Sequence, residues 1–137
     1  RTPIQWDDTE NAGFTTGTPW MKVNPNYKEI NAKAQMADPD SVFHHHRKLI
    51  ALRKQYPVIV YGTYELLLEE DENLYVYKRQ LEDEKLLTVC NFTKEEQKFE
   101  IPEEFVGATC LISNYANEYT QKEITLKPYE AFVLYVK

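Results

Sequence analysis

The N-terminal region contains an acidic pair, Asp7-Asp8, and paired carboxylates can perform acid–base chemistry on a glycosidic bond. That chemistry needs two carboxyl groups that face each other across the bond, roughly 5 to 9.5 Å apart. Neighbouring residues in an extended loop point in opposite directions, so this pair alone makes a poor catalytic dyad. Asp side chains are also common in turns, where they accept hydrogen bonds from the backbone. We therefore expect turn and capping roles for Asp7 and Asp8, and the sequence offers no catalytic residue.

Two other patterns could carry chemistry, the run His44-His45-His46 and the two cysteines. Adjacent residues on a helix point about 100° apart, so three consecutive histidines cannot converge on one metal ion. Cys90 and Cys110 lie in apolar, strand-like runs without metal-ligand spacing, which favours reduced core thiols over the alternative of a disulfide. Neither a Gly-rich phosphate loop nor a Ser-His-Asp or Cys-His set is apparent, so we expect no metal and no cofactor.

The charge balance excludes two classes of partner. The chain has 16 Lys and Arg residues against 22 Asp and Glu residues, a formal net charge of −6. Nucleic acids and anionic membrane surfaces are bound by clustered basic residues, so we expect neither as a partner. No apolar run approaches the ~20 residues of a membrane-spanning helix. The chain begins with Arg1 and without a signal peptide, and we expect a piece of a longer, soluble, cytoplasmic protein.

The first part of the chain combines a long loop with one helix. Residues 1 to about 37 hold most of the loop signals, and a loop of this length usually carries function. A short helical turn is expected from Ile30 to Met36. Asp38 as the N-cap and Pro39 at the first helical position predict a helix over residues 39–56, which Pro57 ends.

After Pro57 the apolar period becomes that of β-strands. The short polar connections leave no room for crossover helices, so the sheets must be antiparallel. We predict a mainly β protein with an antiparallel Greek-key β-sandwich. Its expected strands are Val58–Tyr61, Thr63–Leu68, Leu74–Arg79, Lys85–Asn91, Gln97–Ile101, Thr109–Ser113, Glu123–Leu126 and Ala131–Val136.

The long loop resembles a segment from one branch of the α-amylase superfamily, in which Arg-Thr-Pro-Met-Gln-Trp is usual. That branch includes oligo-1,6-glucosidase, glucan-1,6-α-glucosidase, other α-glucosidases, trehalose-6-phosphate hydrolase and sucrose isomerase. This segment departs from that pattern at Ile4, where Met is usual. The resemblance covers essentially the whole chain and rests on Arg1–Asp8, Asn11–Thr15, Pro19-Trp20, Val23–Asn31, Asp40–Phe43, Lys48–Arg53, Val60–Tyr64 and Leu126–Ala131.

The resemblance implies an architecture and a mechanism. Residues 1–56 would be a remnant of a catalytic (β/α)8 barrel, namely the loop after strand eight and the last helix. Residues 57–137 would be the C-terminal β-sandwich. The parent would be a retaining α-glucosidase that acts on short isomalto- or malto-oligosaccharides. Its catalytic Asp and Glu residues, and the neighbours that set linkage preference, would precede this segment. The missing barrel is then the expected partner, and Arg1 the one expected substrate-binding residue.

Further expectations concern the loop and the function of the chain alone. Gln5, Trp6 and Asp7 would shape the loop. Its aromatic residues could stack on sugar faces, but we expect them to anchor the loop to a core outside this chain. By itself the chain would be inactive and would stabilise the barrel. The apolar positions Val42, Leu49 and Ile50 would then be exposed and could drive self-association. The alternative is a carbohydrate-binding module with a platform formed by Tyr61, Tyr64, Tyr75 and Tyr77.

Overall fold

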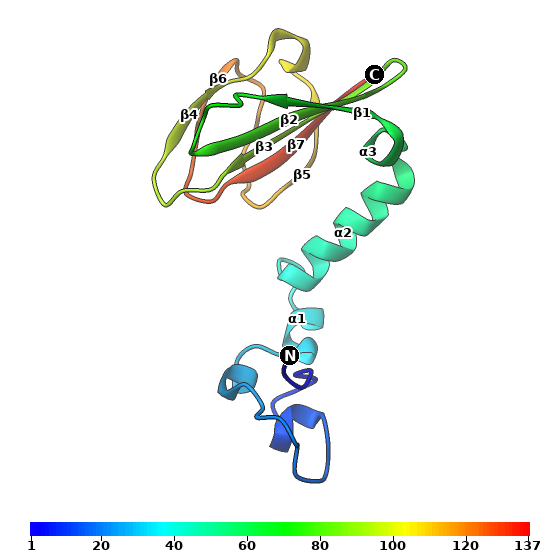
Figure 1. Cartoon of the computed structure of the whole chain (residues 1–137), viewed down its shortest axis with the longest axis vertical. Helices are drawn as coiled ribbons and strands as arrows, with labels where there is room; N and C mark the ends of the chain where they lie inside the picture. The colour runs from blue at the N-terminus through cyan, green and yellow to red at the C-terminus, as the bar shows by residue number, and fades with distance from the viewer. The chain divides into compact units, whose positions relative to one another are not determined.

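The computed structural model describes all of residues 1–137, which divide into two units, Arg1–Lys48 and Leu49–Lys137. The first unit is rich in loops. It contains two short 3-10 helices, followed by α1 and the beginning of α2 (Figure 1). In chain order these elements are η1 (Glu10–Gly13), η2 (Pro25–Lys28), α1 (Ala32–Ala37) and α2 (Val42–Gln55).

The predicted start of the long helix is wrong by one short turn. Asp38 is the C-cap of α1, and its side chain accepts a hydrogen bond from the Asp40 N–H at 3.0 Å, which folds the 38–41 segment into a turn. Ser41 precedes the first helical residue instead, and its Oγ lies 3.4 Å from the backbone nitrogen of His44. The same hydroxyl donates to the Gln35 carbonyl at 2.6 Å, so this serine joins the two helices. A Ser residue competes well with Asp for the N-cap position.

Helix α2 buries none of its residues within this chain. The three residues that we call the apolar stripe, Val42, Leu49 and Ile50, are 78%, 43% and 46% exposed. They recur at the spacing of one helix face, as an amphipathic helix that packs against a partner requires. The expected exposure of the stripe is therefore confirmed. His46, which shares this face, is also exposed.

The first predicted strand, Val58–Tyr61, is a short helix, α3 (Val58–Tyr61). Pro57 adopts helical angles (φ −57°, ψ −29°), and its carbonyl accepts hydrogen bonds from Val60 and Tyr61. Three carbonyls of α3 and its C-cap accept hydrogen bonds from the Arg79 guanidinium, at distances of 2.8 Å (Gly62), 3.3 Å (Val58) and 3.5 Å (Val60). This long-range cap overrides the strand propensity of a Val-Ile-Val run.

The second unit is the predicted antiparallel β-sandwich. One sheet has the strand order β1-β2-β3-β7-β5, and these strands lie side by side in Figure 1. The other sheet pairs β4 with β6, so the chain crosses repeatedly between sheets in a Greek-key manner. The strands are β1 (Thr63–Leu67), β2 (Leu74–Leu81), β3 (Glu84–Asn91), β4 (Gln97–Glu100), β5 (Thr109–Ser113), β6 (Glu123–Leu126) and β7 (Ala131–Val136).

The hydrophobic core lies between the two sheets. Every second residue of the central strands points inward, and the pairs Val76↔Val89 and Val89↔Phe132 place these three side chains in one row. The second sheet and its connections cover this row with apolar residues, including a Tyr119 ring stacked 3.9 Å from that of Phe132. The buried cluster is Leu74, Val76, Leu87, Val89, Phe99, Ile101, Phe105, Tyr119, Leu126, Phe132 and Leu134.

One carboxylate belongs to this core. Glu130 is fully buried, next to the inward residue Phe132 on the same strand face. Its oxygens accept hydrogen bonds from the Asn117 amide (2.5 Å), the Tyr119 hydroxyl (2.6 Å) and the Lys127 N–H (2.7 Å). A buried charge is tolerated only where hydrogen bonds replace its water. Glu130 therefore ties the 117–119 segment to the turn before β7.

The two cysteines are free thiols. Cys90 is half-buried on β3, and burial raises the pKa of its thiol above the ordinary value. Cys110 is exposed on the edge strand β5, so the expectation of a core position is wrong for this residue.

None of the helices has the length and apolar character to cross a membrane.

Replacing Arg79 with Ala should lower the free energy of unfolding by about 1–3 kcal/mol, because three carbonyls of the α3 segment lose their shared donor. Urea denaturation followed by circular dichroism measures this loss. Gln80→Ala, at an exposed position on the same strand, is the control and should change it by less than about 0.5 kcal/mol. Equal effects of the two substitutions would contradict the capping role.

Replacing Glu130 with Ala should lower the free energy of unfolding by about 3–5 kcal/mol, because the buried Tyr119 hydroxyl, the Asn117 amide and the Lys127 N–H lose their acceptor. Glu130→Gln keeps the shape of the side chain and one acceptor oxygen. It should therefore lower the free energy of unfolding by less than Glu130→Ala does. Thermal unfolding at neutral pH, with exposed Glu123→Ala as the control, gives the ranking. A Glu130→Ala variant as stable as the control would show that the network contributes nothing.

Candidate functional site

The loop that carries the sequence motif is held in shape by Gln5. Its side-chain amide donates to the Asn26 Oδ1 at 3.0 Å and also to the Ile30 carbonyl. Its backbone carbonyl accepts the Ala32 N–H at 2.8 Å, at the start of α1. Gln5 thus joins the first residues of the chain to the segment around η2, and it has the scaffolding role that the sequence suggests.

Asp7 organises a left-handed turn. Its Oδ1 accepts hydrogen bonds from the hydroxyl and the N–H of Thr9, which hold the pKa of this carboxyl below its ordinary value. Three consecutive residues then have positive φ, namely Asn11 (53°), Ala12 (59°) and Gly13 (64°). A Cβ atom at position 13 would lie 2.7 Å from the Asp7 Oδ1, so both the angle and the space require glycine.

The two aspartates have separate partners. The Asp8 carboxylate lies 3.7 Å from the Lys33 ammonium, and its carbonyl accepts a hydrogen bond from the Lys28 ammonium at 2.8 Å. Asp7 is used in the turn at Thr9, as predicted. The pair does not converge on a common point, so the geometry offers no opposed carboxylates in this loop.

Arg1 lies at one side of a small cavity of 280 Å³ in the first unit. Its side chain is exposed and makes no ion pair or hydrogen bond within the chain. Trp20, at the same cavity, is 89% exposed, and Phe14 is 44% exposed. The remaining lining residues are Thr2, Pro3, Ile4 and Met21. The cavity combines one free cation with apolar and aromatic surface, and the roles of Arg1 and of these rings stay predictions.

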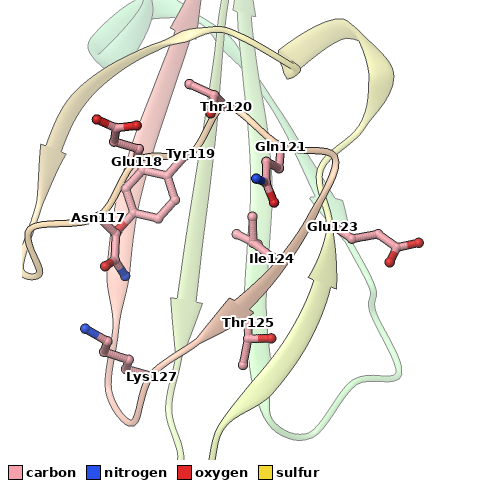
Figure 2. Close-up of a pocket in the computed structure, with 9 residues that line it drawn as sticks. All are labelled: Asn117, Glu118, Tyr119, Thr120, Gln121, Glu123, Ile124, Thr125 and Lys127. Atoms are coloured by element: carbon pink, nitrogen blue, oxygen red, sulfur yellow. The ribbon is translucent and has the colours of Figure 1, made fainter.

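A second cavity, of 420 Å³, lies over β6 and the segment before it, and Figure 2 shows its lining. The residues are mostly polar: Asn117, Glu118, Tyr119, Thr120, Gln121, Glu123, Ile124, Thr125 and Lys127. The Glu118 and Glu123 carboxylates point outward on opposite sides of it (Figure 2). Burial and the hydrogen bond to Glu130 raise the pKa of Tyr119 above its ordinary value, so this phenol is a structural donor. These two carboxylates therefore do not face each other across the cavity.

Sequence reasoning missed Glu130, although a signal was present. Residues 130, 132 and 134 share one strand face, and an acidic residue on a face with Phe132 and Leu134 predicts a buried charge that needs partners.

Of the predicted aromatic platform, Tyr64, Tyr75 and Tyr77 do meet on the outer face of the large sheet. Tyr61 belongs to α3 instead.

Two family models match the chain in succession. Residues 1–62 match the α-amylase catalytic domain, and residues 74–133 match the α-amylase SusG C-terminal domain. The join between the two matches lies near the change from helix to strands.

Relatives and solved structures agree with these matches. The oligo-1,6-glucosidase of Parageobacillus thermoglucosidasius is 53% identical over 100% of this chain and 25% of the relative. The trehalose-6-phosphate hydrolase of Bacillus subtilis is 46% identical over 97% of this chain and 24% of the relative.

Two crystal structures superpose closely on the chain. That of the trehalose-6-phosphate hydrolase of Bacillus licheniformis gives a TM-score of 0.91 at 47% identity, over 98% of this chain and 25% of that one. That of the trehalulose synthase of Pseudomonas mesoacidophila gives 0.92 at 40% identity, over 100% and 25%. The chain thus spans about a quarter of the length of these proteins. It belongs to the α-amylase superfamily, in the branch of the oligo-1,6-glucosidases and trehalose-6-phosphate hydrolases, and carries a stretch of the catalytic domain followed by the C-terminal β-sandwich domain.

Proposed function

We propose that this chain acts as the C-terminal part of a retaining α-glucosidase that hydrolyses short isomalto- or malto-oligosaccharides. The observation that carries the proposal is the apolar stripe of α2, a helix face without a partner in a chain that spans a quarter of its relatives. Residues 1–56 complete the catalytic barrel, and residues 57–137 form the domain that stabilises it. The matches to a catalytic-domain model and then a C-terminal-domain model support this division.

The chemistry belongs to residues outside this chain. A retaining glycosidase needs an acidic nucleophile and an acid–base carboxyl about 5–5.5 Å apart. In this chain Asp7 is used by its turn, Asp8 lies near Lys33, and Glu130 is surrounded by donors in the core. The chain alone is therefore inactive, and its part in catalysis is structural apart from Arg1.

Arg1 is the one residue of the chain that we place beside the substrate. Its guanidinium is unpaired and next to exposed aromatic rings, and the Gln5 and Asp7 networks fix the backbone a few residues away. Loops that follow barrel strands build the catalytic face of such enzymes. An arginine held there can donate several hydrogen bonds to sugar hydroxyls or acidic neighbours.

The partner of the apolar stripe is the missing catalytic barrel, and a second copy of this chain takes its place when the barrel is absent. The surplus of acidic residues supports the absence of nucleic-acid and membrane partners. We place the protein in the cytoplasm, which the two free thiols support.

A hybrid enzyme tests the main proposal. This chain would replace the matching quarter of the Parageobacillus thermoglucosidasius oligo-1,6-glucosidase. We expect the hybrid to hydrolyse isomaltose and an aryl α-glucoside, and the chain alone to hydrolyse neither. Leu49→Asp should abolish most activity of the hybrid, because it buries a charge in the helix–barrel contact. Lys48→Asp, on the opposite face, is the control and should keep most of it. Hydrolysis by the purified chain alone would overturn the proposal.

Arg1→Ala in the same hybrid tests the substrate contact. Because the side chain is exposed and unpaired in this chain, we expect little change in melting temperature. The kcat/KM for isomaltose should fall about 10-fold or more, the loss of one charged hydrogen bond, about 1.5–3 kcal/mol. Lys22→Ala, an exposed residue of the same unit, should leave kcat/KM unchanged. Unchanged kinetics for both variants would remove Arg1 from the site.

A further inference from the structure

A cluster of aromatic side chains lies on the outer face of the large sheet, away from the core. Tyr64 of β1 contacts Tyr77 of β2, with ring centroids 5.4 Å apart, and Tyr77 contacts Tyr75 at 5.5 Å. Phe92, one residue past the end of β3, stands edge-on to Tyr75 at 6.3 Å. The hydroxyls of Tyr64 and Tyr75 are 3.0 Å apart, which joins the two strands at the surface. The rings therefore form one continuous surface.

This surface borders a groove of 420 Å³ at one end of the sheet. Phe92 is 67% exposed and Tyr75 is 41% exposed, so ring surface is available to a ligand. The groove, which we call the Phe92 groove, is lined by Asp71, Glu72, Asn73, Leu74, Tyr75 and Phe92.

The polar side of the Phe92 groove is a turn of fixed shape. One oxygen of Asp71 accepts the N–H groups of Asn73 (2.8 Å) and Leu74 (2.9 Å), and the Asn73 carbonyl accepts the N–H of Phe92 (3.0 Å). The other Asp71 oxygen, the Glu72 carboxylate and the Asn73 side-chain amide make no hydrogen bond within the chain. These groups are held beside the rings and are free to bind hydroxyl donors.

We propose that the Phe92 groove binds a neutral α-gluco-oligosaccharide. A glucose unit has an apolar face that packs on an aromatic ring and a rim of hydroxyls that donate to carboxylates. The acidic turn disfavours phosphate and other anions. The groove involves six residues, whereas a stable protein interface uses about 20–30 residues per side. A short saccharide therefore fits this surface better than a folded partner does.

The site needs no residue of the first unit and no catalytic group, so it is independent of the proposed hydrolase function. Its residues also differ from those of the aromatic platform that the sequence suggests. Tyr77 is half-buried below its neighbours, and Tyr61 is absent from the ring contacts. Phe92 takes their place as the most exposed ring of the cluster.

Titration of the ¹⁵N-labelled full 137-residue chain with isomaltotriose and maltotriose, followed by NMR, tests the proposal. We expect shifts at residues 71–75 and 92 and a Kd on the order of 1 mM. Phe92→Ala should weaken binding at least about 10-fold, because the most exposed ring is lost. Phe92→Trp should retain it. Tyr61→Ala, which removes an even more exposed ring that lies on α3 and outside the cluster, is the matched control and should bind like the unchanged chain.

Each contrary result overturns the site. These results are an absence of shifts at residues 71–75 and 92 with either trisaccharide, equal binding by the Phe92→Ala variant, and loss of binding only in Tyr61→Ala. N-acetyl-lysine amide tests a cationic ligand at the same concentrations, and shifts from this compound without shifts from the trisaccharides would also overturn the proposal. Core resonances unchanged in Phe92→Ala confirm that the fold is intact.

Discussion

The connection between the 117–119 segment and the turn before β7 depends on the buried carboxylate of Glu130. Its hydrogen bonds reach the 117–119 segment, the turn at Lys127 and, through the Tyr119 hydroxyl, Ser113 at the end of β5 (2.6 Å). Segments that belong to different parts of both sheets are thereby held around one charge. The carboxylate also accepts the hydrogen bond of the Tyr119 hydroxyl, whose ring stacks on Phe132, so it stabilises a phenol that would be costly to bury without partners. The hydrogen bonds of Glu130 therefore also stabilise the packing of the Tyr119 ring in the core.

Much of the sandwich could be predicted because its strands follow the alternation rule. The limits of β5, β6 and β7 agree with the sequence prediction, since each is a short run with β-branched or aromatic residues between turn residues. Val58–Tyr61 could not be assigned correctly by this rule. The group that decides its conformation, the Arg79 guanidinium, lies on β2 and is far away in sequence. In the same way Ser41 takes the place of Asp38 at the helix start because it also bonds to Gln35 in the preceding helix.

Functional residues were predictable only where a local motif carries them. The loop motif led to Arg1, Gln5 and Asp7, and the structure shows the bonds by which the last two shape the loop. Phe92 had no such signal, because it follows a strand as a single exposed aromatic residue, and only the register of β2 with β3 brings it beside Tyr75. The outer sheet face also contains the hydroxyl of Thr88, which is buried without a hydrogen-bond partner. Such features depend on tertiary neighbours and cannot be assigned from local pattern.

The position of β7 in the large sheet has a consequence for biosynthesis. This strand lies between β3 and β5, yet it follows all the other strands in chain order. A ribosome delivers the chain from its N-terminus, so β3 must wait with one unpaired edge while about forty further residues are made. During that interval its apolar side chains are protected on the β2 side alone. Nascent chains stalled before residue 131 should therefore be the species that chaperones retain and proteases remove.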